Sequence, residues 1–440
     1  MKKRIRYQTV SVQAIESERM RSALGGAGQT CIVALDIAKQ AMVAGFANAQ
    51  GRCEKLVRFS HPTETLVFLG RLEMLRELGL KIEVAMEPTG VYGDALRYQL
   101  LKRGFEVYRV DPTRSHAMAS VLDGVPSLHD AKSCTLIAHL HAHQLSTAWR
   151  DKSVHERELR ALLREYELYS DPFERNRGLL EGYLGTHFPE LFEHVDSKST
   201  WHLRLLLEFG SPARIAAARP KATALLRRVS RGALTPEKID AIINAAQRSL
   251  GESMSEGEVR GVQALVRCML EQRERMKEVR KRIRAYVNEL PELAPMVETF
   301  GPVTTAALVA DLGDPANYGS SAAFEKALGL NLKEKSSGNL VGQVHITKRG
   351  PSRSRRYLYL AALRLVKSDP VVRAWYQARS SYKANHKLKA VVAVMRKLAR
   401  ALVHLARGHR FDARKLFDCR RLQLPDIAER IEPSALVASA

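Results

Sequence analysis

The first third of the chain alternates short apolar runs with amphipathic stretches. Its first strong run lies in residues 30–39, with a strand expected over 31–36; it is rich in β-branched and small residues and carries one carboxylate, Asp36. An apolar run of this length after a glycine-rich stretch predicts a buried central strand. The remaining pattern predicts helices over 63–78 and 92–103 and strands over 41–47, 55–59, 81–86 and 106–110. This order of elements predicts a mixed α/β sheet covered by helices.

The middle of the chain, residues 151–290, has few strand signals and predicts helices. One helix is expected over 155–169 and another over 172–183, because a proline at position 172 disfavours a helix interior. Over residues 257–290 apolar residues recur with a heptad period, and charged residues fill the outer positions. Such a repeat predicts a coiled coil or a long packed helical pair. Dimerisation through this face and a helical hairpin within one chain both satisfy the pattern.

The charge of the chain indicates its kind of partner. Seventy lysines and arginines stand against 47 aspartates and glutamates, a formal net charge of +23 that is spread along the sequence. Such an excess favours a polyanionic partner, and nucleic acid is the commonest one. The five cysteines have no zinc-ligand spacing, which is typical of a reduced protein. No window reaches the roughly 18 apolar residues of a membrane span, so we expect a cytoplasmic protein with no membrane partner.

Three carboxylates occur where the predicted sheet would bring them together. Asp36 ends the first predicted strand, Glu87 follows the strand over 81–86, and Asp130 begins a helix predicted over 130–145. The carboxyl ends of neighbouring strands open into one crevice, where α/β sheets place their sites. Mg²⁺ prefers oxygen ligands, and a pair of such ions can activate an attacking oxygen and stabilise a leaving one. In a basic chain, these acids predict metal-dependent phosphodiester chemistry, with Mn²⁺ as an alternative ion.

Several motifs resemble a known family. Residues 34–39 (Ala-Leu-Asp-Ile-Ala-Lys), 86–92 (Met-Glu-Pro-Thr-Gly-Val-Tyr) and 126–133 (Pro-Ser-Leu-His-Asp-Ala-Lys-Ser) are similar to the RuvC-like DEDD domain of bacterial insertion-sequence transposases of the IS110 type, whose relatives include Piv-like DNA invertases. The resemblance implies a ribonuclease-H-like fold with Asp36, Glu87 and Asp130 as the first three metal ligands. Residues 329–366, with Ser337-Gly338 and a Thr-Lys-Arg-Gly run at 347–350, resemble the C-terminal transposase domain of the same family.

The fourth metal ligand departs from the family pattern. The family has Asp-x-x-Asp at this point, whereas this chain has Asp130 followed by Ser133. A hydroxyl is a poor Mg²⁺ ligand, so a second ion would be weakly held, bound through water, or completed by another group. Asp123 and the softer His129 are the candidates for that group. Loss of activity is therefore one of the interpretations that the sequence leaves open.

A serine near the C-terminus is the candidate nucleophile. On sequence grounds alone a Ser-Ser-Gly run is common in loops, but in the family the serine of the Ser-Gly pair has this role. The resemblance transfers that role to Ser337, with Ser336 as the less suitable neighbour. A serine needs a base or a metal to become nucleophilic. The cations around this loop are expected to contact nucleic-acid phosphates: Lys333, Lys335, Lys348, Arg349, Arg353, Arg355 and Arg356.

The resulting hypothesis is a DNA transposase or recombinase that cleaves and rejoins double-stranded DNA through a phosphoserine intermediate. The resemblance further implies a homo-oligomer, a dimer or tetramer, and an element-encoded bridge RNA as guide. Two alternatives stay open: a Mg²⁺-dependent RuvC-like junction nuclease in which water attacks, and a catalytically weakened nucleic-acid-binding relative. The expected parts are a basic arm (1–29), the RuvC-like metal domain (30–150), a helical and coiled-coil region (151–290), a mainly helical C-terminal domain with the serine loop (291–418) and a tail (419–440).

Overall fold

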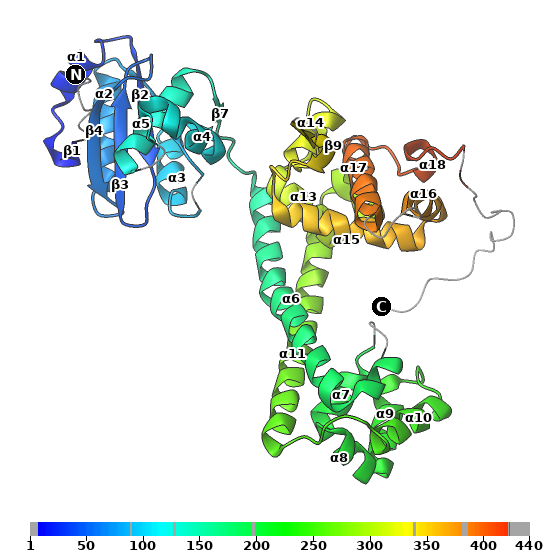
Figure 1. The fold of residues 1–440 in the computed structure, drawn as a ribbon. Coiled ribbons are helices and arrows are strands. Elements are labelled where there is room, and N and C mark those ends of the chain that lie inside the picture. The colour runs from blue at the N-terminus through cyan, green and yellow to red at the C-terminus, as the bar shows by residue number, and fades with distance from the viewer. Residues whose placement is uncertain are drawn as a thin grey trace. The chain divides into compact units, whose positions relative to one another are not determined.

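The chain forms two units, residues 1–151 and residues 152–440. The structure is a computed structural model that describes residues 8–88, 90–125, 129–195, 199–337, 340–380, 386–420 and 422, and Figure 1 traces their helices and strands. Only the backbone is described for nine of these residues: Leu122, Asp123, Lys335, Ser336, Ser337, Leu340, Val341, Gln343 and His386.

A seven-stranded mixed sheet forms the centre of the first unit, in the order β1-β4-β3-β2-β5-β6-β7. Strands β2, β5 and β6 are parallel neighbours, and β3, β4 and β7 each run antiparallel to a neighbouring strand. The predicted mixed α/β sheet is therefore confirmed. The strands are β1 (Thr9–Ser11), β2 (Thr30–Asp36), β3 (Ala41–Ala47), β4 (Cys53–Ser60), β5 (Lys81–Met86), β6 (Glu106–Val110) and β7 (Ser146–Ala148). The helices are η1 (Val12–Ala14), α1 (Ser17–Ala23), α2 (Thr65–Glu77), α3 (Asp94–Lys102), α4 (Pro112–Asp123) and α5 (Asp130–Ala142).

Alternation along the central strands decides which side chains face which helix. Val33 packs in one core with α2 and α3, whereas its neighbour Ala34 packs in a second core with α5. Side chains of a strand point to opposite faces in turn, so Asp36, two residues after Ala34, projects to the side of α5. Ala85 of β5 belongs to the same core as α5, and Glu87 follows it by two residues. The sequence thereby directs both acids toward one helix.

Residues 9–24, part of the predicted basic arm (1–29), fold onto this sheet. Strand β1 pairs in parallel with β4 and so forms one edge of the sheet, and α1 packs against α2. The residues that join the core are Val12, Ile15, Met20 and Leu24. Val10 packs against the same core as a partly buried residue. Polar residues separate these apolar ones at irregular intervals, so the segment has no strong period. Residues 1–7 of the predicted arm lie outside the described residues.

The second unit is built on two long helices, α6 (Val154–His187) and α11 (Glu256–Asn288), which lie side by side (Figure 1). The segment that connects them along the chain forms a helical lobe. It contains η2 (Pro189–Glu193), α7 (Trp201–Phe209), α8 (Pro212–Ala217), α9 (Arg219–Ser230) and α10 (Pro236–Gln247). The remainder comprises η3 (Pro291–Leu293), α12 (Ala294–Phe300), α13 (Pro302–Leu312), η4 (Pro315–Asn317), α14 (Ser321–Ala327), β8 (Leu332–Ser337), β9 (Leu340–Ile346), α15 (Ser352–Ser368), α16 (Pro370–Ser380), α17 (His386–Ala406) and α18 (Ala413–Leu416).

The heptad face of α11 is buried within the chain. Val279 and Ile283 are almost fully buried in one core with Leu159 and Leu163 of α6, and Met269 lies in the core of the helical lobe. Of the two arrangements that the repeat predicts, the structure has the long packed helical pair within one chain. A coiled coil between subunits is not needed to cover these residues, because α6 and the lobe already bury them.

Helix α6 passes through Pro172 without ending, whereas the sequence predicts two helices separated at this point. A proline removes one backbone hydrogen bond and crowds the preceding turn. Packing of α6 along α11 outweighs this local preference, as tertiary contacts commonly do for long amphipathic helices. The neighbouring Asp171 also forms an ion pair with Arg356 of α15 at 2.7 Å.

The C-terminal part is mainly helical, as predicted, but the expected serine loop is a β-hairpin. Strands β8 and β9 pair in antiparallel fashion with an irregular register near Ser337. Buried Glu325 of α14 accepts hydrogen bonds from Arg396 Nε at 2.7 Å and Arg400 Nε at 2.6 Å, which ties α14 to α17. Among the described helices, none has both the length and the apolar composition to cross a bilayer.

Candidate carboxylate site and serine hairpin

Strands β2 and β5 bring Asp36 and Glu87 to the same edge of the sheet. In this parallel pair Leu35 lies opposite Met86. Asp36 follows Leu35 and Glu87 follows Met86, so the two acids come next to each other at the ends of the two strands. Both side chains are partly buried. The predicted convergence of these two acids at the carboxyl ends of neighbouring strands is therefore present in the structure.

Helix α5 supplies the third acid. It packs across β2 and β3 and begins at Asp130, whose side chain is exposed. One turn later Ser133 donates a hydrogen bond to the Asp36 carboxylate. Asp130, in the first turn of α5, also interacts favourably with the positive end of the helix dipole. Asp130 and Ser133 share a face of α5 because residues three apart lie one above the other.

The pKa of Asp36 shows that the three carboxylates are electrostatically coupled. Burial is the largest cause and, with the negative charges of Asp130 and Glu87, raises this pKa from an ordinary 3.8 to about 6. Hydrogen bonds from Ser133 and from the Ile37 backbone N–H lower it again, but less strongly. A divalent cation would relieve this cost, because it favours the ionised form of each acid.

The donor set fits a magnesium ion better than a softer metal. Asp36, Glu87 and Asp130 offer carboxylate oxygens, which Mg²⁺ prefers, and an ion of this kind usually retains water in its shell. As the side chains stand, however, no group of three or more His, Cys, Asp or Glu in the described residues is closed around a metal position.

The candidates for a fourth ligand have other positions. Ser133 Oγ is engaged with Asp36. His129 is the N-cap of α5, and its Nδ1 accepts a hydrogen bond from the Lys132 backbone N–H at 3.3 Å. The side chain of Asp123 lies outside the described residues. Ser133 therefore contacts an acid of the site directly.

Lys132 was not singled out from the sequence. Its side chain is only 1% exposed, and its Nζ donates to the Val125 carbonyl at 2.5 Å. This hydrogen bond attaches the start of α5 to the chain that precedes it. The only sequence signal was a lysine among residues that otherwise form the buried face of the helix.

The serine hairpin places Ser337 at the last position of β8, opposite Leu340. The side chains of Ser336 and Ser337 lie outside the described residues, so the structure tests neither as a nucleophile. The base of the hairpin is well defined. There the Thr347 N–H donates to the Asn331 carbonyl at 2.9 Å, and Thr347 Oγ1 donates to Asn331 Oδ1 at 2.6 Å.

Two glycines explain why the base can close so tightly. Gly329 has a φ of +72°, and an added Cβ there would lie 2.7 Å from the Arg349 backbone nitrogen. At Gly350 an added Cβ would lie 2.3 Å from the Ala327 carbonyl oxygen. Only glycine permits this backbone approach. The Gly and Thr-Lys-Arg-Gly motifs thus join the end of α14 to the end of β9.

Comparison with known proteins decides the family. A model of DEDD-type IS110 transposases, described as "Transposase", matches residues 33–189, and one described as "Transposase IS116/IS110/IS902 family" matches residues 295–377. Together the two matches cover more than half of the chain. The chain belongs to the IS110 family of transposases. The first match contains Asp36, Glu87 and Asp130, and the second contains Ser337.

One relative of this IS110-family chain is the insertion element IS110 uncharacterized 43.6 kDa protein of Streptomyces coelicolor. The two are 25% identical over 219 residues, which is 48% of this chain and 53% of that protein. The chain thus matches about half the length of this curated relative.

The predicted phosphate-contacting cations of this IS110-family chain fall into two groups. Lys333, Lys348 and Arg349 are exposed on the hairpin and its base, and the described residues give them no ion-pair partner. The side chain of Lys335 lies outside the described residues. Lys348 adopts a left-handed φ of +55°. This conformation is uncommon for residues other than glycine, and residues that adopt it are often found at functional sites.

The three arginines of α15 are engaged within the chain. Arg353 pairs with Asp311 and with Glu167, the latter at 3.4 Å. Arg355 donates to the carbonyls of Leu328 and Gly350, and Arg356 pairs with Asp171. These contacts give the three guanidiniums a structural role that the sequence did not reveal.

The Asp36→Asn variant should be more stable than the wild-type protein at neutral pH without metal, by about 2 kcal/mol. Each unit of pKa shift corresponds to about 1.4 kcal/mol, and partial exposure of Asp36 reduces the sum. Because the pKa is higher in the folded state, the wild-type protein gains stability below about pH 4 and loses it as the pH rises through about 6. Urea unfolding in EDTA from pH 4 to 8 measures the difference between the two proteins.

Magnesium should reverse this order. Added Mg²⁺ stabilises whichever folded protein binds it, so the wild-type protein should gain stability and Asp36→Asn should not. Asp94→Asn, which removes an exposed acid of α3 paired with Arg97, is the matched control and should respond to Mg²⁺ as the wild-type protein does. A variant no more stable than the wild-type protein at pH 8 would contradict the coupling.

Proposed function

We propose that this protein is a DNA transposase that cleaves and rejoins double-stranded DNA with a carboxylate-bound metal and a serine nucleophile. The observation that carries the proposal is the meeting of Asp36, Glu87 and Asp130, from two strands and a helix, in a coupled acidic site. Membership of the IS110 transposase family and the net charge of +23 support DNA as the substrate.

Asp36, Glu87 and Asp130 would hold Mg²⁺, or Mn²⁺ in its place. Bound there, the ion supplies Lewis-acid stabilisation of charge at the scissile phosphate. The protein contributes the placement of the three acids: two are fixed by the register of β2 and β5, and the third by the start of α5. Ser133 orients the Asp36 carboxylate by its hydrogen bond.

Ser337 Oγ would attack a DNA phosphorus atom. The hydroxyl loses its proton, one P–O bond of the strand breaks, and the leaving strand end takes up a proton as a free hydroxyl. The other end remains attached to the protein as a phosphoserine ester, so the energy of the bond is kept. Attack on this ester by the hydroxyl of a partner strand releases Ser337 and rejoins the DNA. Exposed Lys333, Lys348 and Arg349 would bind the phosphate backbone next to the serine.

The family resemblance extends the proposal to further partners. Recombination joins two DNA molecules, so we propose a dimer or tetramer. A structured bridge RNA would guide the pairing of target and donor. The burial of the heptad face of α11 against α6 means that the subunit contacts would use other surfaces.

A covalent adduct is the direct test. The protein is incubated with Mg²⁺ and DNA from the ends of its insertion element, with candidate element RNA, and the products are run on a denaturing gel. The proposal predicts a protein–DNA adduct whose tryptic peptide carries a phosphodiester on Ser337. Cleavage without any adduct would favour a RuvC-like nuclease in which water attacks.

The Ser133→Asp variant should bind magnesium more tightly and cleave faster, by about tenfold. The added acid would lie one helical turn from Asp130 and complete the family's Asp-x-x-Asp pattern. Without metal it adds a further negative charge beside Asp36, so the variant should be less stable in EDTA. Mg²⁺-dependent thermal unfolding and single-turnover cleavage measure both effects.

Ser133→Asn is the control for this change, since it keeps a polar side chain without adding charge. It should show neither gain. The catalytically weakened relative remains the second candidate function, because Ser133 stands where the family has an acid. An inactive wild-type protein that becomes active only as Ser133→Asp would establish that second candidate.

A further inference from the structure

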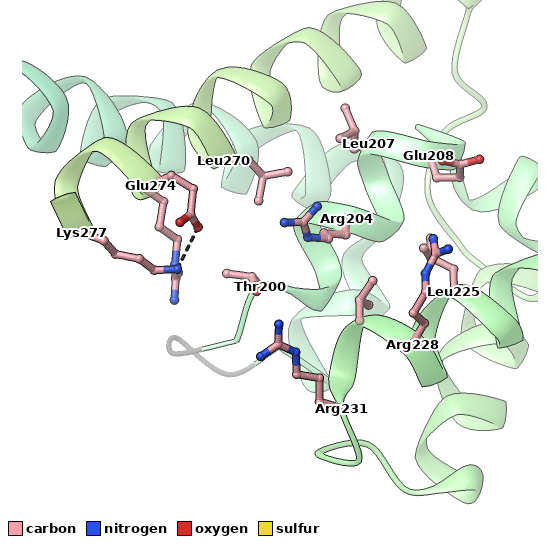
Figure 2. A pocket seen from close by; sticks show the side chains of 12 residues that line it. Thr200, Arg204, Leu207, Glu208, Leu225, Arg228, Arg231, Leu270, Glu274 and Lys277 are labelled. Atoms are coloured by element: carbon pink, nitrogen blue, oxygen red, sulfur yellow. Dashed lines mark hydrogen bonds and ion pairs between the residues drawn. The ribbon is translucent and has the colours of Figure 1, made fainter. Parts of the chain in front are cut away.

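A basic cavity lies in the helical lobe of the second unit. It has a volume of about 750 Å³ and is formed by α7, α9 and α11 (Figure 2). Of the residues that the structure describes, five cations line it: Arg204, Arg228, Arg231, Arg273 and Lys277. The two lining carboxylates are Glu208 and Glu274, so three positive charges are in excess.

Glu274 neutralises only part of the positive charge of the cavity. Glu274 forms an ion pair with Lys277 at 2.8 Å, and its pKa is lowered by that contact first and by Arg204 and Arg273 more weakly. Arg204, Arg228 and Arg231 have no ion-pair partner among the described residues. Like charges gathered around one cavity repel one another unless an anion lies between them.

The backbone at Arg231 adds a second observation. Arg231 ends α9 in the left-handed conformation, with a φ of +51°. This position at a helix end is usually taken by glycine, which has no Cβ penalty, and Gly232 is the very next residue. The left-handed position is thus occupied by Arg231, although a glycine there would be less strained. In Figure 2 the side chains of Arg204, Arg231 and Lys277 are directed toward the same space from three elements.

The apolar part of the lining points to the kind of anion. Leu207, Leu225 and Leu270 are partly buried and take part in the cavity wall. A free inorganic anion makes no favourable contact with an apolar surface. A nucleotide unit, in contrast, presents a charged phosphate together with the apolar faces of its sugar and base. Nucleic-acid grooves combine a cationic path for the backbone with apolar contacts in this way.

We infer that this cavity is a binding site for the phosphodiester backbone of a nucleic acid, formed by Arg204, Arg228 and Arg231 over a leucine floor. It deepens the proposed function by assigning a nucleic-acid contact to a lobe that lies outside both family matches. The site needs neither the carboxylates nor Ser337, because it acts by binding alone. DNA and RNA share the chemistry that it recognises.

The test compares two triple variants of the full-length chain with matched loss of charge. One carries Arg204→Gln, Arg228→Gln and Arg231→Gln. The control carries Arg227→Gln, Arg267→Gln and Lys281→Gln, three exposed positions of α9 and α11 that do not line the cavity. Binding of a labelled DNA duplex, a DNA single strand and an RNA hairpin is measured by fluorescence anisotropy over a salt series in EDTA, which keeps cleavage out of the readout. Thermal unfolding checks that both variants fold.

The cavity variant should bind at least one of the three probes about tenfold more weakly at moderate salt, with the control near wild type. The slope of log Kd against log salt should fall by about two to three, since each lost contact accounts for roughly 0.7 to 0.9. The probe that responds identifies DNA or RNA as the occupant. Equal losses in both variants, or none in the cavity variant, would overturn the assignment. Because no step depends on cleavage, failure here leaves the proposed transposase chemistry untouched, and an inactive transposase leaves this site testable.

Discussion

Replacing Asp36 with asparagine should reduce magnesium-dependent strand cleavage by about 10³-fold or more, although the variant folds and is more stable without metal. A bound metal ion contributes several kcal/mol of charge stabilisation in phosphodiester chemistry, and about 4 kcal/mol corresponds to that factor. Asparagine keeps the shape of the side chain and can still accept the hydrogen bond from Ser133. The loss therefore reports the charge of the acid. Single-turnover cleavage of element-end DNA, measured from gel time courses, gives the rate.

Asp94→Asn is the appropriate control, because Asp94 is an exposed acid of the same unit, on α3. It should cleave at the wild-type rate. Cleavage by Asp36→Asn at the wild-type rate would remove the carboxylate site from the mechanism. A wild-type protein without activity, unchanged by the substitution, would point to the weakened nucleic-acid-binding relative instead.

The sheet and its acids were predictable because their signals are local and strong. Apolar runs such as residues 31–36 and 81–86 predict the two central strands, and the period of two predicts the side to which Asp36 and Glu87 point. Asp130 could be placed because a helix start is readable from the sequence. The coupling of the three acids then follows from the strand order, which the resemblance implied and the structure provides.

Other features could not be predicted because distant contacts decide them. Pro172 predicts a helix end, yet packing along α11 carries α6 through it. Residues 9–24 lack a clear period, and long-range contacts hold them: pairing with β4 and packing against the core of the sheet. Likewise, the sequence places both Arg353 and Lys348 near the serine as cations. Only the fold shows that Arg353 forms ion pairs with Asp311 and Glu167.

The Ser337→Ala variant should lose the covalent protein–DNA adduct entirely and strand cleavage by about 10⁶-fold, the scale seen when a nucleophilic serine is removed. No other group replaces the hydroxyl that forms the phosphoserine ester. The base of the hairpin is held by Asn331, Thr347 and the two glycines, so removing one oxygen at the last residue of β8 should leave the fold intact. DNA binding should also be unchanged, because Lys333, Lys348 and Arg349 remain.

Ser336→Ala is the matched control at the adjacent position and should retain both adduct and cleavage. Denaturing gels with labelled DNA, followed by peptide mapping of any adduct, distinguish the two serines. If Ser336→Ala lost the adduct and Ser337→Ala kept it, the nucleophile would be the neighbour. If Ser337→Ala cleaved at the wild-type rate with a metal-dependent site intact, water would be the attacking group, and the carboxylates alone would carry the reaction as in a RuvC-like nuclease.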